Sequence, residues 1–272
     1  MKKATLTLLA AIALALFPTV LHAQDGRVDS TDVSSRRIGQ WIITRESTYS
    51  SDADGAATHS SVSYDITGVH GFEPHLPLFS IGFSNFVDAP LSATFSSIPF
   101  NEAKSWEWNV MLPLDGKAIG DSGHFGIGSA FGFGRTTYKF AGTDCFLTDP
   151  ESRVTYLDKP AGDWKETWLR YWTLRVPVVL EYRTSGDGFS IGVGPELEYR
   201  FAPSSRGRAD GMKKSDVITK DLDFHPLGVN LLAQVGFGDF SVMARASLIE
   251  LFANSTPTTT VCPVSIVFGI GF

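Results

Sequence analysis

Apolar residues alternate with polar or small residues along most of this chain, from about residue 76 onward. The last nine residues, VSIVFGIGF, show the pattern clearly. Val264, Ile266, Phe268, Ile270 and Phe272 share one side of an extended chain, and small or polar residues fill most of the other. A period of two residues predicts a β-strand with one apolar face.

Seven earlier segments alternate in the same way, which makes eight in all. The connections between them fall at residues 87–103, 114–121, 141–166, 184–187, 202–221, 237–239 and 251–261. Eight such segments predict an all-β fold, an eight-stranded antiparallel β-barrel.

Long and short connections alternate without exception along this series. A transmembrane barrel with both ends in the periplasm produces this asymmetry, because its outer loops are long and its periplasmic turns are tight. Two of the short connections, Thr184–Asp187 and Gly238–Asp239, carry residues typical of hairpin turns. A soluble sandwich gives no reason for such a pattern.

The two faces of these segments indicate which one meets lipid. The polar face is rich in Gly and Ser and has few Lys, whereas a water-facing surface normally carries more charge. The apolar face carries aromatic residues near the strand ends, as in the aromatic girdles of membrane barrels. These residues are Trp106, Trp108, Trp168, Trp172, Tyr182, Phe189, Tyr199, Phe237 and Phe240. A soluble closed barrel with the aromatic residues in its core remains the alternative.

The first 23 residues have the features of a secretory signal peptide. Lys2 and Lys3 precede an apolar stretch, and Leu21-His22-Ala23 fits a cleavage site, giving a mature start near Gln24. An uncleaved membrane anchor is the alternative. Residues 24–73 are polar, with two weak strand-like pieces at Ile38–Tyr49 and Thr58–Thr67. We expect them to form a short periplasmic extension before a barrel of residues 74–272.

Charge and composition narrow the possible partners. The chain has 23 basic and 29 acidic residues, so removal of Lys2 and Lys3 leaves 21 against 29 and a net charge of −8. This balance argues against nucleic acid. Charged residues make up 19% of the chain, below the roughly 25% of soluble domains. No apolar run after the signal peptide reaches the roughly 20 residues of a membrane helix, so a membrane location requires a barrel.

The terminal strand resembles that of Gram-negative outer-membrane barrels, which commonly ends in Phe. The segments FSIGFSNF, SWEWNV, GIGSAFGFGRTTYKF and YWTLRVPVVLEYR look like successive strands of the PorT-type family of outer-membrane β-barrel proteins. In particular, Leu174–Tyr182 is similar to a strand of that family with a central Pro. The resemblance covers roughly residues 76–272, and it brings no catalytic residues.

The resemblance implies a location in the cell outer membrane, with outer-membrane lipid as a partner. It also implies that Phe272 is an assembly signal for the barrel-insertion machinery. Periplasmic chaperones are expected partners during assembly.

Few residues suggest catalysis or cofactor binding. The glycines of GIGSAFGFG lie within a strand with no following helix, so a nucleotide loop is not indicated. The histidines show no metal-ligand spacing. His225, close to Asp221 and Asp223, lies near the predicted outer rim and keeps open an enzyme of the Ser-His-acid type. We expect no catalytic residues, no metal and no cofactor.

Charged residues on the predicted inward face are more informative. They are Glu107, Glu181, Glu196, Glu198, Arg175, Arg200 and Arg245. Charges inside a narrow barrel must be paired, since unpaired burial is costly. An ion-pair network that fills the lumen is the preferred interpretation, and a conducting pore is the alternative.

Cys145 and Cys262 are the only cysteines in the sequence, and both fall on the predicted extracellular side. The compartment is oxidising. We therefore expect a disulfide that ties the 141–166 loop to the start of the last strand. Two free thiols on mobile loops are the alternative.

Together these observations predict a non-enzymatic outer-membrane barrel with a structural or binding role, exerted through its extracellular loops or its periplasmic extension. An outer-membrane hydrolase or acyltransferase with a site at the outer rim is one alternative. A narrow passive channel is the other.

Overall fold

A computed structural model describes residues 30–38, 41–51, 57–68, 72, 74–120, 122–184 and 188–271. The chain divides into two compact units, Met1–Gly71 and Phe72–Phe272. Apart from a three-residue 3-10 helix, η1 (Glu102–Lys104), the regular structure of the described residues is entirely β-strand. The predicted all-β class is therefore confirmed. Within the described ranges, no helix is long and apolar enough to cross a membrane.

The first unit contains a small antiparallel sheet. Its strands β1 (Ser30–Ile38), β2 (Trp41–Ser51) and β3 (Ala57–Gly68) lie in the order β1-β2-β3. The alternation pattern indicated β2 and β3 but missed β1, because the polar sequence STDVSSRRI has almost no apolar residues to alternate. The predicted signal peptide, residues 1–23, lies outside the described residues.

The second unit is built around one large antiparallel sheet of nine strands. These strands are β4 (Phe79–Val87), β5 (Trp106–Ile119), β6 (Phe125–Lys139), β9 (Trp164–Arg183), β10 (Ser190–Ala209), β11 (Asp216–Thr219), β12 (Leu227–Phe237), β13 (Phe240–Ser247) and β14 (Cys262–Ile270). A separate hairpin consists of β7 (Cys145–Thr148) and β8 (Thr155–Asp158).

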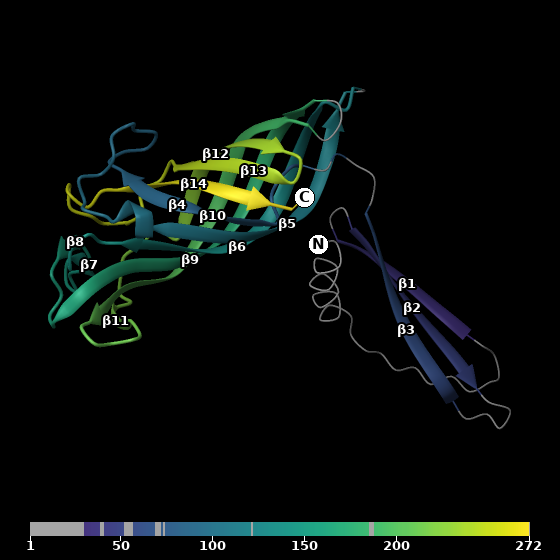
Figure 1. The fold of residues 1–272 in the computed structure, drawn as a ribbon, viewed down its shortest axis with the longest axis horizontal. Coiled ribbons are helices and arrows are strands. Elements are labelled where there is room, and N and C mark those ends of the chain that lie inside the picture. The colour runs from purple at the N-terminus through teal and green to yellow at the C-terminus, as the bar shows by residue number, and fades with distance from the viewer. Residues whose placement is uncertain are drawn as a thin grey trace. The chain divides into compact units, whose positions relative to one another are not determined.

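The large sheet closes into a ring (Figure 1). Strand β14, the last in the chain, pairs with β13 on one side and with β4, the first of the sheet, on the other. Strand β9 pairs with both β6 and β10, and this second contact completes the ring. The short strand β11 pairs with β10 alone among the described strands. The predicted closure of an antiparallel sheet is thus confirmed.

Two strands extend well beyond the predicted segments. Strand β5 runs through residues 114–119, and the 20-residue strand β10 continues through residues 202–209, although the pattern assigned both stretches to connections. A bulge between Phe201 and Ser204 interrupts the ladder there. Because a bulge breaks the two-residue period, the alternation ends while the pairing goes on.

The connections at the two ends of the ring differ in length. The connections from β5 to β6, from β9 to β10 and from β12 to β13 are short and define the short-connection end, and residues 88–105, 140–163, 210–226 and 248–261 form the long-connection end. The β7–β8 hairpin and β11 both belong to the long-connection end (Figure 1).

Candidate functional site

The closed sheet has a polar, charged interior and an apolar exterior. On β10, Glu196 and Glu198 are almost fully buried, at 0% and 3% exposure, while Ile191, Val193 and Leu197 are between 48% and 61% exposed. Alternate residues of a strand point to opposite faces, so the carboxylates face the interior of the ring and the aliphatic side chains face outward. This is the reverse of the arrangement in a water-soluble domain.

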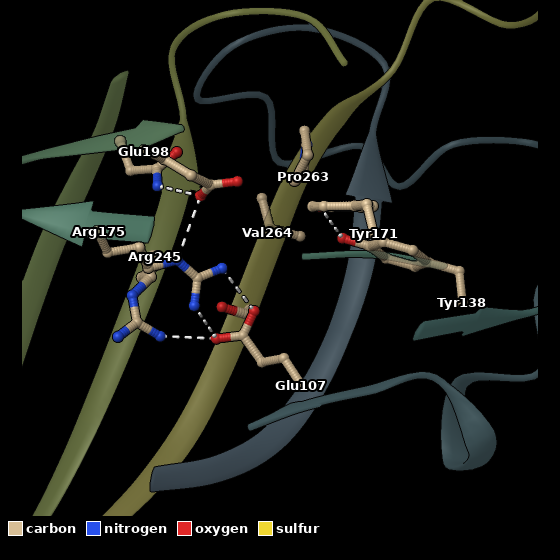
Figure 2. A pocket seen from close by; sticks show the side chains of 10 residues that line it. Glu107, Tyr138, Tyr171, Arg175, Glu198, Arg245, Pro263 and Val264 are labelled. Carbon is tan, nitrogen blue, oxygen red and sulfur yellow. Dashed lines mark hydrogen bonds and ion pairs between the residues drawn. The ribbon is translucent and has the colours of Figure 1, made fainter. Parts of the chain in front are cut away.

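Glu107 and Arg245 lie at the centre of the buried ionic network (Figure 2). Arg245 Nη1 donates to Glu107 Oε1 at 2.6 Å, and its Nε donates to Glu196 Oε2 at 3.1 Å. Arg175 reaches both oxygens of Glu107 at 3.3 Å and also donates to Asn109 Oδ1. These side chains come from β5, β9, β10 and β13, so the network links strands around the ring.

Glu198 extends this network toward Arg200. Arg200 Nε donates to Glu198 Oε1 at 3.0 Å, and Arg175 Nε donates to Glu198 Oε2 at 3.4 Å. Asn230 on β12 donates to Glu196 Oε1 and Glu198 Oε2 at 2.9 and 2.8 Å. Arg200 also donates to Ser247 Oγ at 2.9 Å. Both carboxylates therefore have charged and neutral donors.

The ionic network balances its own charge. Three carboxylates, Glu107, Glu196 and Glu198, face three guanidinium groups, Arg175, Arg200 and Arg245. The cavity beside them has a volume of about 10 Å³, the space of a single water molecule. Arg245 lines this cavity, and its Nη2 atom has no hydrogen-bond partner among the described residues. The interior at this level is filled by side chains.

Glu181 belongs to a different cluster from the six residues just described. His75 donates its backbone N–H to Glu181 Oε2 at 2.8 Å, and its ring Nδ1 lies 2.6 Å from Glu181 Oε1. Gln234 Nε2 also donates to Glu181, at 3.0 Å. The contacts thus unite six of the seven predicted network residues and place Glu181 apart with a histidine.

His75 comes from a segment, residues 74–78, that the alternation pattern did not single out. An added Cβ on Gly128 would lie 2.4 Å from Pro74 Cβ, and one on Gly269 would lie 2.4 Å from Pro77 Cβ. These inward-facing glycines therefore leave the space that the segment occupies. We call residues 74–78 the plug segment. Gly128 belongs to the GIGSAFGFG segment, which the sequence placed in a strand without identifying the residues that pack against it.

Two apolar clusters lie on either side of the ionic network. Toward the short-connection end lies a cluster of seven buried residues, Leu76, Met111, Ala130, Val179, Leu232, Met243 and Val267. Toward the long-connection end lies an aromatic-rich cluster, which we call the mouth cluster. Its buried members are Phe86, Ile98, Tyr138, Phe140, Cys145, Phe146, Leu169, Tyr171, Leu222, Phe224, Leu251, Phe252 and Val261. Strand β9 shows the order directly, since Tyr171, Arg175, Val179 and Glu181 follow one another along its inward face.

The predicted disulfide is wrong. Cys145 and Cys262 are both free and both buried. Cys145 lies on β7, opposite Asp158, and packs in the mouth cluster, whereas Cys262 lies on β14, opposite Val87. The 141–166 loop nevertheless packs against the end of the ring, because Cys145 and Phe146 belong to the mouth cluster. Its β7–β8 hairpin is held there by apolar packing and by a hydrogen bond from Ser205 Oγ to the Phe146 carbonyl, so no covalent link is needed.

The acidic residues near His225 are occupied by other partners. Arg153 Nη1 donates to both oxygens of Asp221, at 2.7 and 2.9 Å, and Asn254 donates to Asp223 at 2.9 Å. Hydrogen bonding to Asp221 raises the pKa of Arg153 above its ordinary value. Among the described residues, no hydrogen bond joins the His225 ring to Asp221 or Asp223. The same ranges hold no group of three or more His, Cys, Asp or Glu side chains placed to bind a metal ion.

Phe272, the predicted assembly signal, lies outside the described residues, which end at Gly271. Comparisons with protein-family models, curated proteins and solved structures found no match to this chain. The fold and the interior define the class of this protein, a closed antiparallel sheet with a charge-balanced interior.

Proposed function

We propose that this chain is an outer-membrane protein whose closed sheet spans the lipid bilayer as an eight-stranded barrel. The observation that carries the proposal is the reversed burial pattern of the sheet. Phe79, Ile81 and Phe83 on β4 are 39–56% exposed, while the inward Ser80 and Ser84 between and beside them are buried. A continuous apolar exterior is costly in water and favourable in a hydrocarbon layer.

The pairings that complete the ring support the proposed strand count of eight. We count β4, β5, β6, β9, β10, β12, β13 and β14 as its members and treat β11 as an attached strand on β10. The shortest members, β4 and β14 with nine residues and β13 with eight, are close to the roughly 9–11 residues of a membrane-spanning strand.

The long connections support an orientation in which the mouth cluster faces the cell exterior. Bacterial outer-membrane barrels have short periplasmic turns and longer extracellular loops. The signal-peptide pattern and the resemblance to PorT-type barrels agree with export to the outer membrane. In this orientation the unit with β1–β3 follows the signal peptide and belongs to the periplasm.

The filled interior supports a structural or binding role that is neither enzymatic nor channel-forming. The mouth cluster, the ionic network, the second apolar cluster and the plug segment follow one another along the axis. An eight-stranded barrel leaves an interior just wide enough for side chains. Binding would then occur at the extracellular loops or at the periplasmic extension.

Cell fractionation combined with gel mobility tests this proposal. The full chain is expected in the outer-membrane fraction, and unheated samples should migrate differently from boiled ones, because a closed barrel resists detergent. A soluble periplasmic protein with the same mobility before and after heating would overturn the proposal.

A further inference from the structure

A band of cationic side chains crosses the outward face of β6, β9 and β10, just beyond the apolar exterior. On β6, Arg135 and Lys139 follow Phe131 and Phe133 at the two-residue spacing that keeps them on the same face. Arg170 on β9 and Arg206 and Arg208 on β10 lie at the same end of their strands, and we call these five residues the cationic band.

The strand registers bring the five residues together. Arg135 is opposite Trp172 and Arg170 is opposite Thr137, which puts them on adjacent strands two residues apart in register. On the other side of β9, Arg206 is opposite Trp168. Arg135 and Arg206 both act electrostatically on Arg170, so three like charges share one small area.

The cationic band is short of negative partners. Glu166 forms ion pairs with Lys139 and Arg208. Arg135, Arg170 and Arg206 have no ion pair with a carboxylate among the described residues, and the Nε atoms of Arg135 and Arg170 have no hydrogen-bond partner there. Arg206 donates only to neutral acceptors, the hydroxyl and the carbonyl of Ser215, at 3.2 and 2.9 Å. Five cations and one contacting carboxylate leave a net charge of +4, in a chain whose overall charge is −6.

Tryptophan rings hold the guanidinium groups of Arg135 and Arg170 in position. Arg135 lies over Trp106 and Trp172, at 5.6 and 5.3 Å from the ring centroids, and Arg170 lies over Trp168 at 5.5 Å. Cation–π contacts of this kind restrain an arginine without neutralising it. Tryptophan also prefers the boundary between hydrocarbon and polar headgroups. The cationic band therefore lies at headgroup level if the exterior below it contacts acyl chains.

We propose that the cationic band binds the phosphate groups of an anionic lipid of the outer leaflet, with the acyl chains of that lipid lying along the apolar exterior. This inference rests on the proposed membrane location. Guanidinium groups bind phosphate through paired hydrogen bonds. Arginines that lack a carboxylate partner at a membrane surface are therefore suited to bind phosphorylated headgroups. A lipid differs from a free phosphate ion as a ligand because its acyl chains also contact the apolar exterior.

Lipid retention by the full chain tests this proposal. The protein is folded into vesicles of phosphatidylcholine containing one tenth of a bisphosphorylated glucosamine lipid, extracted in mild detergent, and analysed by native mass spectrometry. Wild-type protein should retain the bisphosphorylated lipid well above its share of the vesicle. The triple variant Arg135→Gln, Arg170→Gln and Arg206→Gln should retain at most about one tenth of the amount of this lipid that the wild type retains.

A matched control removes the same amount of charge from the loops at the same end. The variant Lys104→Gln, Lys213→Gln and Lys214→Gln changes three exposed cations and should retain the lipid as the wild type does. If the triple arginine variant does not fold, the single variant Arg170→Gln is measured instead, with an expected loss of several-fold.

Three results would overturn the inference. The first is equal retention of phosphatidylcholine and the bisphosphorylated lipid by the wild type. The second is unchanged retention in the arginine variants. The third is complete displacement by 10 mM inorganic phosphate, which would indicate a free-phosphate site. Failure of the wild type to insert into vesicles at all would instead contradict the proposed membrane location, so the two failures are distinguishable.

Discussion

Glu107 is the residue on which the charge balance of the interior depends most directly, because two arginines converge on it. It is 3% exposed and is bonded to Arg175, Arg245 and Asn109. Loss of its charge leaves two buried guanidinium groups with too little negative charge around them. A buried pair broken on one side costs far more than the intact pair contributes.

We predict that Glu107→Gln lowers the free energy of unfolding by roughly 3–5 kcal/mol. Urea titration of the protein folded in detergent, followed by tryptophan fluorescence, measures the change. The control is Asp210→Asn, which removes the carboxylate of the exposed Lys165–Asp210 pair and should produce no measurable change. If Glu107→Gln has the same urea unfolding midpoint as the wild type, the Glu107 carboxylate is not buried in an ion pair.

The free thiols give a prediction about reactivity. Burial raises the pKa of Cys145 from its ordinary value of 9.0 to about 12, so the folded protein keeps this thiol protonated at pH 8. We expect iodoacetamide at pH 8 to label Cys145 on the order of 100-fold more slowly in folded protein than in urea-unfolded protein. Mass spectrometry of a non-reduced digest provides the rate, and a Cys145–Cys262 linked peptide would contradict the structure.

The raised pKa of Cys145 also fixes the direction of a pH effect. The folded state holds the thiol proton more tightly than the unfolded chain does. The stability gained from this group is therefore fully present below pH 9 and is lost as the pH rises toward 12.

At the scale of elements, the plug segment is the part of the interior that depends on glycine. Gly128→Val would place side-chain atoms where Pro74 lies. We predict that this variant displaces residues 74–78 and lowers stability by roughly 1–3 kcal/mol, as overpacked interiors do. Limited digestion with proteinase K should then cut near Leu78 in the variant before it cuts there in the wild type.

Gly142→Ala is the matched control for the plug segment. A Cβ at Gly142 meets Asp144 Oδ2 at 3.6 Å, an ordinary contact. This variant should keep the wild-type digestion pattern. Identical patterns for all three proteins would show that the plug segment does not depend on the space beside Gly128.

Strand β14 has a special place because it joins the two ends of the sheet. Its residue Ile270 lies opposite Phe240 of β13 on one side and opposite Phe79 of β4 on the other. We predict that deletion of Phe272 lowers the amount of folded protein in the outer membrane several-fold, since this terminal aromatic residue is the expected recognition signal for the barrel-insertion machinery. Replacement by Tyr, which keeps an aromatic terminus, should preserve assembly. Membrane levels that stay unchanged after deletion would remove Phe272 from the assembly process.

For the whole molecule, the filled interior predicts the absence of a conducting path. The cavity beside the ionic network is about 10 Å³, too small to connect the two ends. Planar bilayers containing the purified full chain should show no stepwise conductance above background in 1 M KCl. Reproducible unitary steps from folded protein would contradict the filled interior.

Sequence alone predicted the ring because its strands obey one period and their charged residues share one face. Glu107, Arg175, Glu196, Glu198, Arg200 and Arg245 were expected to point inward, and they form the network. The plug segment was not foreseen, because Pro74–Leu78 has no alternation and its partner Glu181 is 106 residues from His75. The cysteine pairing failed because sharing one end of a barrel does not bring two side chains to bonding distance.

The accessibility of spin labels to oxygen and to a water-soluble chelate shows whether the outward face of the sheet lies in lipid. Nitroxide labels on single cysteines introduced at Val193, Leu197 and Ile266 probe this face in the vesicle-bound full chain. A label at Glu151, in the turn between β7 and β8, provides the aqueous reference. If this face lies in lipid, the three outward labels collide readily with oxygen and rarely with a water-soluble nickel chelate, whereas the Glu151 label does the opposite. Outward labels as accessible to the chelate as the Glu151 label would contradict a location in lipid.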